Sequence, residues 1–193
     1  MKKKATIAVT ALLLVLCFTI GGTLAWLKTE TTPVVNTFTY GDINITLTEE
    51  AGKDSDYEFK MIPGNDITKD PKVTVEANSE ACWLFVEVEK TNNPDAYIEY
   101  AINSCWTALD GVDGVYYYNG TDLNQLLTAH KTYYILTGDK VTVKDTVTKT
   151  DMTSIRTNYP MLTFTANAVQ KANVNDVADA WTIANNQGQL PTT

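Results

Sequence analysis

Residues 81–90 (ACWLFVEVEK) constrain the fold more than any other segment, because their side chains alternate between two faces. A period of two residues is the period of a β-strand. One face is wholly apolar and carries Cys82, Leu84, Val86 and Val88. The other face carries Trp83, Phe85, Glu87 and Glu89. A strand with an apolar face buries it against a second layer, so the segment predicts a β-sandwich.

Shorter runs of strand-forming residues follow one another along most of the chain. Turn signals such as Pro63-Gly64, residues 92–95 and Gly138-Asp139 separate these runs. Strands are predicted over residues 36–48, 57–62, 72–76, 97–102, 104–109, 115–118, 131–136, 140–147 and 160–170, and short helices over 122–129 and 175–184, the second capped by Asn175. This pattern predicts an all-β fold, an antiparallel β-sandwich or jelly roll with one or two short helices.

The N-terminus has the layout of a secretory signal. Residues 1–4 include three lysines, residues 5–20 are almost wholly apolar, and small residues lead up to Ala25. We predict a signal helix that is cleaved between Ala25 and Trp26 by a signal peptidase, so that the processed protein acts outside the cytoplasm. The alternative is an uncleaved membrane anchor, because no charge closes the apolar segment before Lys28.

The acidic charge of the chain narrows its partners. The whole chain has a formal net charge of −8, and removal of the three signal lysines leaves −11. Nucleic acids and anionic membrane surfaces repel such a protein, so neither is expected as a partner. Membrane contact is expected only through the uncleaved signal.

Two cysteines remain after cleavage, Cys82 and Cys105. An exported chain permits a disulfide between them, which would stabilise the fold by roughly 3 kcal/mol. The alternative is a pair of thiols that pack as small apolar residues. Both readings stay open, because the sequence does not place the two Cα atoms within bonding reach.

Catalytic signatures are absent from the sequence. His130 is the single histidine, and one histidine does not make the usual catalytic zinc site without two further carboxylate or cysteine ligands. No glycine-rich phosphate loop and no Gly-x-Ser-x-Gly elbow occurs. We therefore predict no catalytic residue, no metal ligand and no cofactor, and expect the protein not to be an enzyme.

Two polar or aromatic clusters allow a ligand-binding role. Acidic residues in segments 49–50, 54–56 and 110–114 could hold calcium or form solvated turns. Residues 116–118 are three tyrosines, which with Trp106 either form a platform for a carbohydrate or pack in the core with two tyrosines on one face and one on the other.

Several segments resemble one known family. They are residues 21–26 (GGTLAW), 36–48 (NTFTYGDINITLT), 62–71 (IPGNDITKDP), 166–170 (ANAVQ) and 178–181 (ADAW). Together they resemble the TasA and camelysin family of Gram-positive bacteria, secreted proteins released by a SipW-type signal peptidase. The resemblance covers both ends and the middle of the chain, and its opening is the most specific part.

The resemblance implies an exported jelly-roll protein, of a family in which some members assemble into biofilm-matrix fibres. In such fibres the freed N-terminal segment of one subunit adds as a strand to the sheet of the next subunit. The matching donor segment here spans residues 26–40, and its apolar side chains are Trp26, Leu27, Val34, Val35 and Phe38. The partner is then a second copy in a head-to-tail fibre, or a related matrix subunit. The alternative is that the segment folds back into its own sheet.

The expected organisation has four parts: a signal peptide over residues 1–25, an extended segment over 26–40, a jelly-roll domain over 41–186 and a disordered tail over 187–193. Two other functions stay open. The resemblance to camelysin implies a cell-surface metallopeptidase, and the aromatic cluster suggests a surface adhesin or carbohydrate-binding module. Each function places the protein in the extracellular matrix or on the cell surface.

Overall fold

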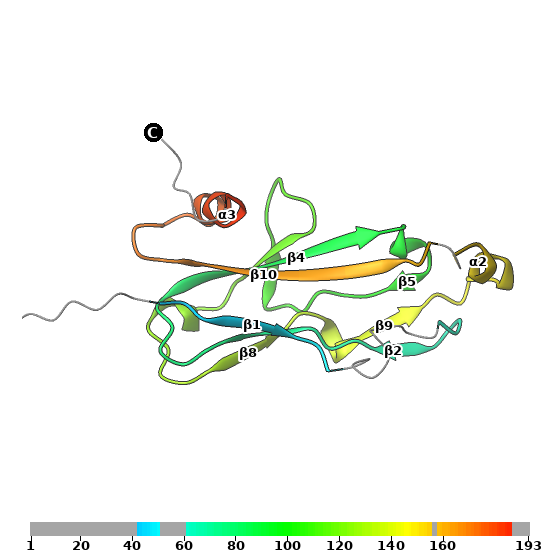
Figure 1. Ribbon diagram of the computed structural model, residues 1–193, viewed down its shortest axis with the longest axis horizontal. Helices are drawn as coiled ribbons and strands as arrows, with labels where there is room; N and C mark the ends of the chain where they lie inside the picture. Colours follow the sequence, from blue (N-terminus) through cyan, green and yellow to red (C-terminus); the bar gives the residue numbers. More distant parts are fainter. Residues whose placement is uncertain (1–41, 51–60, 156–157, 187–193) are drawn as a thin grey trace, which may run out of the picture. The chain divides into compact units, whose positions relative to one another are not determined.

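Three antiparallel sheets form most of the part of the chain that the computed structural model describes, residues 42–50, 61–155 and 158–186 (Figure 1). Those residues belong to one unit, Tyr40–Thr193. The first sheet has the order β1-β3-β8, with bounds Ile45–Thr48, Lys72–Val75 and Lys131–Tyr134. The second has the order β10-β4-β7-β6, with bounds Met161–Gln170, Cys82–Thr91, Val115–Tyr118 and Trp106–Ala108. The third has the order β2-β9-β5, with bounds Asp66–Thr68, Lys140–Val143 and Ile98–Glu99.

Short helical segments join or cover these sheets. They are the α-helices α2 (Lys149–Ser154) and α3 (Val177–Asn185) and the 3-10 turns η2 (Pro94–Ala96), η3 (Asp122–Asn124) and η4 (Thr137–Asp139). Helix α2 begins with a capping box, in which the Thr148 and Asp151 side chains each bond the backbone of the other residue. No helix among the described residues is long and apolar enough to cross a bilayer.

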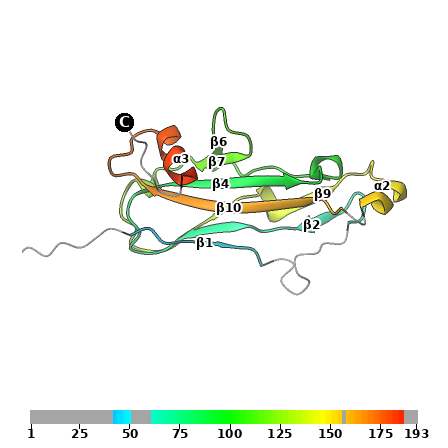
Figure 2. The same ribbon diagram turned by 45° about the horizontal axis from the view of Figure 1, so that its top comes forward.

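Strand β4 lies inside its sheet and packs on both faces. Its residues Cys82, Leu84, Val86 and Val88 belong to a core cluster that also contains Val73 and Tyr133 of the first sheet. Phe85 faces the other way and is fully buried against Trp181 of α3, with ring centroids 5.4 Å apart. Figure 2 shows α3 beside β4 and β10. The strand therefore separates two apolar clusters, one between the sheets and one beneath α3.

The first and third sheets continue into one another. Strands β2 and β3 follow each other along the chain, as do β8 and β9, and two backbone hydrogen bonds span the break. Lys69 N–H donates to Asp139 at 2.8 Å, and Ile135 N–H donates to Pro71 at 3.0 Å. Pro71 has no N–H for a ladder, which accounts for an interruption at this point.

The all-β expectation is confirmed, and so are several of its elements. Strands β3, β4, β7, β8 and β10 fall within a residue or two of their predicted positions, and Tyr116 and Tyr118 face one cluster while Tyr117 faces the other. The predicted helix over 122–129 is wrong beyond its first turn, because only η3 forms. Asp176, not Asn175, caps α3 by accepting from the Ala178 N–H. Strand β2 and helix α2 were not predicted.

A glycine turn between β6 and β7 offers a test of the packing around β4. Gly111 and Gly114 both have positive φ, 74° and 76°, yet only Gly114 is crowded: a Cβ there would lie 2.8 Å from the Val88 carbonyl oxygen. We expect Gly111→Ala to lower the free energy of unfolding by about 1 kcal/mol, and Gly114→Ala to lower it by roughly 1–3 kcal/mol more. Urea unfolding of both variants measures the difference, and equal losses would contradict the close approach.

Candidate functional site

The clearest candidate site is the free edge of β10. This strand pairs with β4 over all ten of its residues, and it is the outermost strand of its sheet, with no described strand hydrogen-bonded to its other side. An unpaired edge offers a row of backbone donors and acceptors to an incoming strand. Figures 1 and 2 show β10 running along the length of the sheet.

The ladder itself indicates which backbone groups face the free side. Val88 N–H donates to Gly114 at 2.8 Å, which directs Val88 toward β7 and, by alternation, its neighbour Glu87 toward β10. The register partner of Glu87 is Thr165, so Thr165 directs its N–H and C=O toward β4. The alternate residues of β10 then present theirs to the free edge: Leu162, Phe164, Ala166 and Ala168.

The side chains of those four residues are apolar and only half-buried, although they pack against the core cluster. Their neighbours on β4, such as Leu84 and Val86, are almost fully buried. The core-facing side chains are therefore buried on β4 but only partly buried on β10. A strand added to this edge would bury further apolar surface, at roughly 25 cal/mol for each Å².

Strand β1 forms a second edge that faces the first. It pairs only with β3 among the described strands, and its Cα atoms come within 8 Å of those of β10 without a ladder between the two. Leu47 remains 37 % exposed although its register partner Val73 is fully buried. Apolar side chains at both edges are thus only partly buried, on the same side of the core.

A buried lysine links the two edges. Lys69 Nζ donates to both carboxylate oxygens of Glu49 at 3.0 Å, just beyond the end of β1. The same ammonium lies 5.4 Å from the centroid of the Phe164 ring on β10. We call this group, Glu49, Lys69 and Phe164, the latch. It holds the end of β1 near β10.

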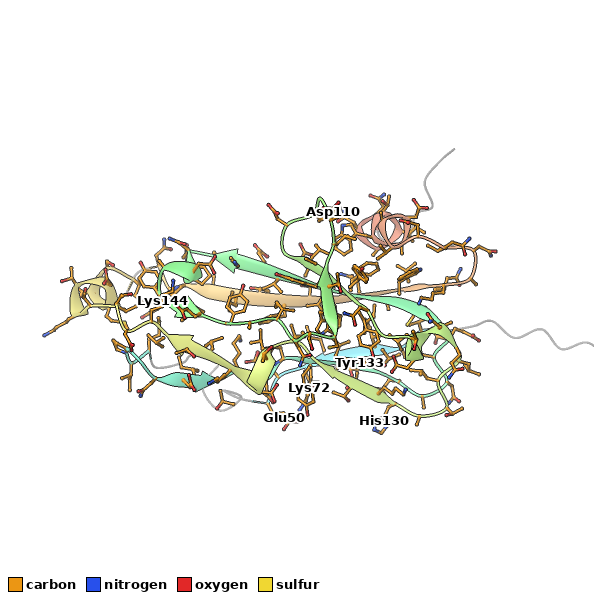
Figure 3. All side chains as sticks on the ribbon, turned by 180° about the vertical axis from the view of Figure 1, so that it is seen from behind. Glu50, Lys72, Asp110, His130, Tyr133 and Lys144 are labelled. Carbon is orange, nitrogen blue, oxygen red and sulfur yellow. The ribbon has the colours of Figure 1, made fainter. Side chains whose placement is uncertain are left out.

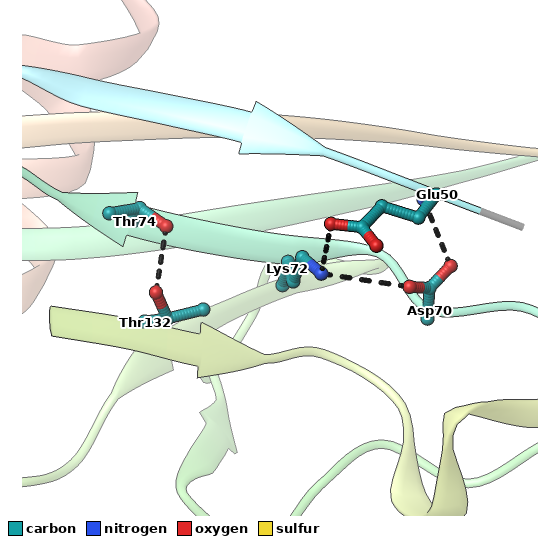
Figure 4. A network of polar contacts seen from close by, with 5 residues as sticks. All are labelled: Glu50, Asp70, Lys72, Thr74 and Thr132. Carbon is teal, nitrogen blue, oxygen red and sulfur yellow. Dashed lines mark hydrogen bonds and ion pairs between the residues drawn. The ribbon is translucent and has the colours of Figure 1, made fainter. Parts of the chain in front are cut away.

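A second polar network fixes the same end of β1 to the outer face of its sheet (Figure 4). Lys72 Nζ lies 2.9 Å from Glu50 Oε1 and 3.7 Å from Asp70 Oδ2, and Asp70 accepts from the Glu50 N–H at 3.1 Å. The hydrogen bond to Glu50 is the main cause that raises the pKa of Lys72. Thr74 and Thr132 share a hydrogen bond of 2.9 Å across β3 and β8.

The residues predicted to act in strand donation lie outside the described residues. They are the cleavage pair Ala25 and Trp26, and the donor side chains Leu27, Val34, Val35 and Phe38. The expected signal helix, its cleavage and the disordered tail over 187–193 fall outside them as well. The described chain begins at Asp42, close to the start of β1.

A cluster of tyrosines surrounds Asp122 at the end of the core. Asp122 Oδ2 accepts from Tyr133 Oη at 2.8 Å and from Lys131 Nζ at 3.0 Å, while Oδ1 is buried with no hydrogen-bond partner among the described residues. Burial acts to raise the pKa of Asp122, but the donated hydrogen bonds outweigh it and hold that pKa below its usual value. Burial, and then the carboxylate, raise the pKa of Tyr118 to about 12 and also raise that of Tyr133.

The aromatic cluster packs in the core. Trp106 is almost fully buried and donates its ring N–H to the Tyr134 carbonyl at 2.9 Å. Its ring meets Tyr118 at a centroid distance of 5.9 Å, and Tyr118 meets Tyr133 at 4.3 Å. Of the two roles left open by the sequence, this arrangement favours core packing for Trp106 and Tyr118, because their rings pack edge to face.

The cysteines are free thiols in the structure. Cys82 begins β4 and Cys105 precedes β6, and β7 lies between these strands. Two strand spacings of about 4.8 Å separate the residues by more than the roughly 7 Å that a disulfide spans. The disulfide considered from the sequence is therefore not formed. Burial raises the pKa of the Cys82 thiol to about 11, which leaves little reactive thiolate at neutral pH.

The remaining polar candidates do not gather into a site. His130, Asp110 and Asp113 are exposed, and residues 54–56 lie outside the described ranges. Within those ranges no three His, Cys, Asp or Glu side chains come together in an arrangement that could hold a metal ion. Figure 3 shows Asp110 and His130 well apart on the domain.

Comparison of the chain with protein-family models, with curated proteins and with solved structures found no match in any of the three. Its function is therefore inferred from the geometry of the two edges and from its sequence.

The Asp122 cluster predicts a stability that depends on pH. Because its folded-state pKa is lowered, Asp122 stabilises the fold above about pH 4, its unfolded value, and this contribution is lost as the pH falls through the folded pKa. We expect Asp122→Asn to lower the free energy of unfolding at pH 7 by about 1–3 kcal/mol. As the pH falls from about 5 through the folded pKa of Asp122, the free energy of unfolding should also decrease less for the variant than for the wild type.

Urea unfolding at pH 7 and at lower pH measures both effects. Asp95→Asn is the matched control, because Asp95 pairs with Lys90 at 2.7 Å on the surface, and such a pair contributes no more than about 1 kcal/mol. Equal losses for the two variants would show that the cluster contributes no more than a surface pair.

Proposed function

We propose that the protein is a secreted structural subunit of an extracellular or cell-surface fibre. The freed segment of residues 26–40 of one copy adds as a strand to the β10 edge of the next copy, or of a related matrix subunit. The proposal includes the jelly-roll form of the sandwich and a structural rather than catalytic role. The single observation that supports it best is that, among the described strands, none is hydrogen-bonded to the ten-residue edge of β10 away from β4, where the core-facing apolar side chains are only half-buried.

The donor and the acceptor have matching lengths and chemistry. About 15 residues in extended form span roughly 50 Å, and a strand of the length of β10 spans about 34 Å. The donor is therefore long enough to cover β10 and still cross to a neighbouring copy. Its apolar residues, including Val34, Val35 and Phe38, would cover the half-buried side chains at the edge.

Strand addition requires β1 to move. An inserted strand needs two spacings of about 4.8 Å between its neighbours, whereas β1 and β10 already lie with Cα atoms within 8 Å. Strand β1 is held by four residues of ladder with β3 and by the latch. Its outward shift would break the Glu49–Lys69 pair or carry it along, and the incoming backbone would supply the hydrogen bonds that both edges lack.

Electron microscopy of the processed chain, residues 26–193, tests the proposal against the same chain without residues 26–35. We expect filaments from the first and none from the second. Monomers from both, under conditions that keep the domain folded, would contradict self-assembly. Filaments from both would contradict a donor role for the deleted segment.

A proline substitution tests the acceptor edge without removing the donor. Ala166 directs its N–H to the free side, so Ala166→Pro keeps the β4 ladder and should fold while its copies fail to accept a strand. Asn167→Pro is the matched control, because Asn167 directs its N–H to β4 and its loss should cost about 1–3 kcal/mol of stability. Filaments from folded Ala166→Pro would exclude β10 as the acceptor.

A further inference from the structure

Exposed apolar side chains concentrate at one end of the sheets. Six large apolar residues of the described chain are exposed, and three of them lie near α2: Ile62, Tyr159 and Met161, at 43, 61 and 49 % exposure. Single exposed apolar residues are ordinary, whereas several at one end of a domain make that end a candidate contact surface. We call this end, with Ile62, Tyr159 and Met161, the α2 end.

Backbone contacts place the three residues at the same end. Asn92, just past the end of β4, donates its side-chain amide to the Tyr159 carbonyl at 2.8 Å, and Met161 pairs with Thr91. Ile62 begins a turn in which the Gly64 N–H donates to Val143 at 2.9 Å, at the end of β9. Figures 1 and 2 show the start of β10 and the end of β9 beside α2.

The opposite end carries a fourth exposed apolar residue, Leu126, at 52 % exposure. The Leu127 N–H donates to Ser79 at 3.0 Å, and Ser79 Oγ accepts from the Asn44 N–H at 3.1 Å. Asp42, which accepts from the Glu80 N–H, lies in the same place. The described chain therefore begins at this end, the Leu126 end. In Figure 3, His130 lies toward the Leu126 end and Lys144 lies toward the α2 end.

We propose that the α2 end of one copy docks against the Leu126 end of the next copy, as a second contact beside the added strand. The inference rests on the proposed function. A donor that leaves its own domain at the Leu126 end reaches the start of a neighbour's β10 most directly where the neighbour's α2 end is adjacent. The apolar group at the α2 end then faces Leu126 and is removed from water.

The direction of the chain agrees with this arrangement. Strand β10 runs from the α2 end to the Leu126 end, because Met161 pairs with Thr91 and Gln170 pairs with Cys82. A donor that enters from the neighbour runs back along β10 from Met161 toward Gln170 as its residue numbers fall. Its N-to-C direction is therefore antiparallel to β10, as strand pairing in this sheet is throughout. Contacts between unlike ends extend into a filament unless the rotation between copies closes a ring.

The critical concentration for filament formation tests the end contact. In the processed chain we expect Tyr159→Ser with Met161→Ser, and separately Leu126→Ser, to raise it about tenfold or more, equivalent to roughly 1.4 kcal/mol per added subunit. Tyr134→Ser is the matched control, because Tyr134 is 42 % exposed but lies on the outer face of β8. We expect the control to stay within about twofold of the wild type, since it lies away from both ends.

A charge pair makes the test specific to contact between copies. Tyr159→Lys and Leu126→Glu alone should each weaken assembly, and together they should restore part of it. The two positions lie at opposite ends of one domain, so their coupling would arise between copies. If the wild type forms filaments and the end variants assemble normally, or if the two charge substitutions show no coupling, the end contact is overturned. Strand addition would still stand. Absence of wild-type filaments would overturn both.

Discussion

The structure depends on burial of β4 on both faces. One face of this strand packs across the core against the first sheet, and the other packs beneath α3, where Phe85 meets Trp181. A central strand of this kind requires strands on each side, and β7 and β10 supply them. Among the described strands none is hydrogen-bonded to β10 on the side away from β4, so the most buried strand of the sheet lies next to an edge strand. The opposite edge of the sheet, β6, is only three residues long.

A long unpaired strand edge is a liability for any protein, because it invites pairing with other extended chains. This domain limits the exposure through β1, which lies beside β10 without pairing, and through the latch at its end. Buried ion pairs contribute little net stability, because loss of hydration offsets attraction. The Glu49–Lys69 pair is therefore better suited to fixing where β1 ends than to strengthening the fold. Such a contact can separate without unfolding the core.

The sequence predicted the strands that show a clear alternation of apolar and polar side chains. It missed the elements that form only through contacts with distant residues. Residues 81–90 and 160–170 identified β4 and β10 because each has a clear face. Strand β2 was missed, since its three residues form only through pairing with β9. Helix α2 was missed because its capping box lies among polar residues with no apolar stripe. Apolar spacing alone suggested a helix over 122–129, but Asp122 bonds Tyr133 and Lys131, and the chain turns away after η3.

Two features follow from the topology and from no local sequence pattern: the position of β10 at the edge of its sheet among the described strands, and the position of Asp42. The sequence predicted a donor from residues 26–40 but gave no acceptor, because strand order is set by long-range pairing. In the proposed assembly β10 would be the acceptor, because the β10 residues whose side chains face the core also direct their backbone groups away from β4. An incoming strand thus meets hydrogen-bonding groups and apolar surface at the same positions. Pairing through backbone groups tolerates many sequences, so in the proposed assembly specificity would depend on the apolar side chains and on the proposed contact between domain ends.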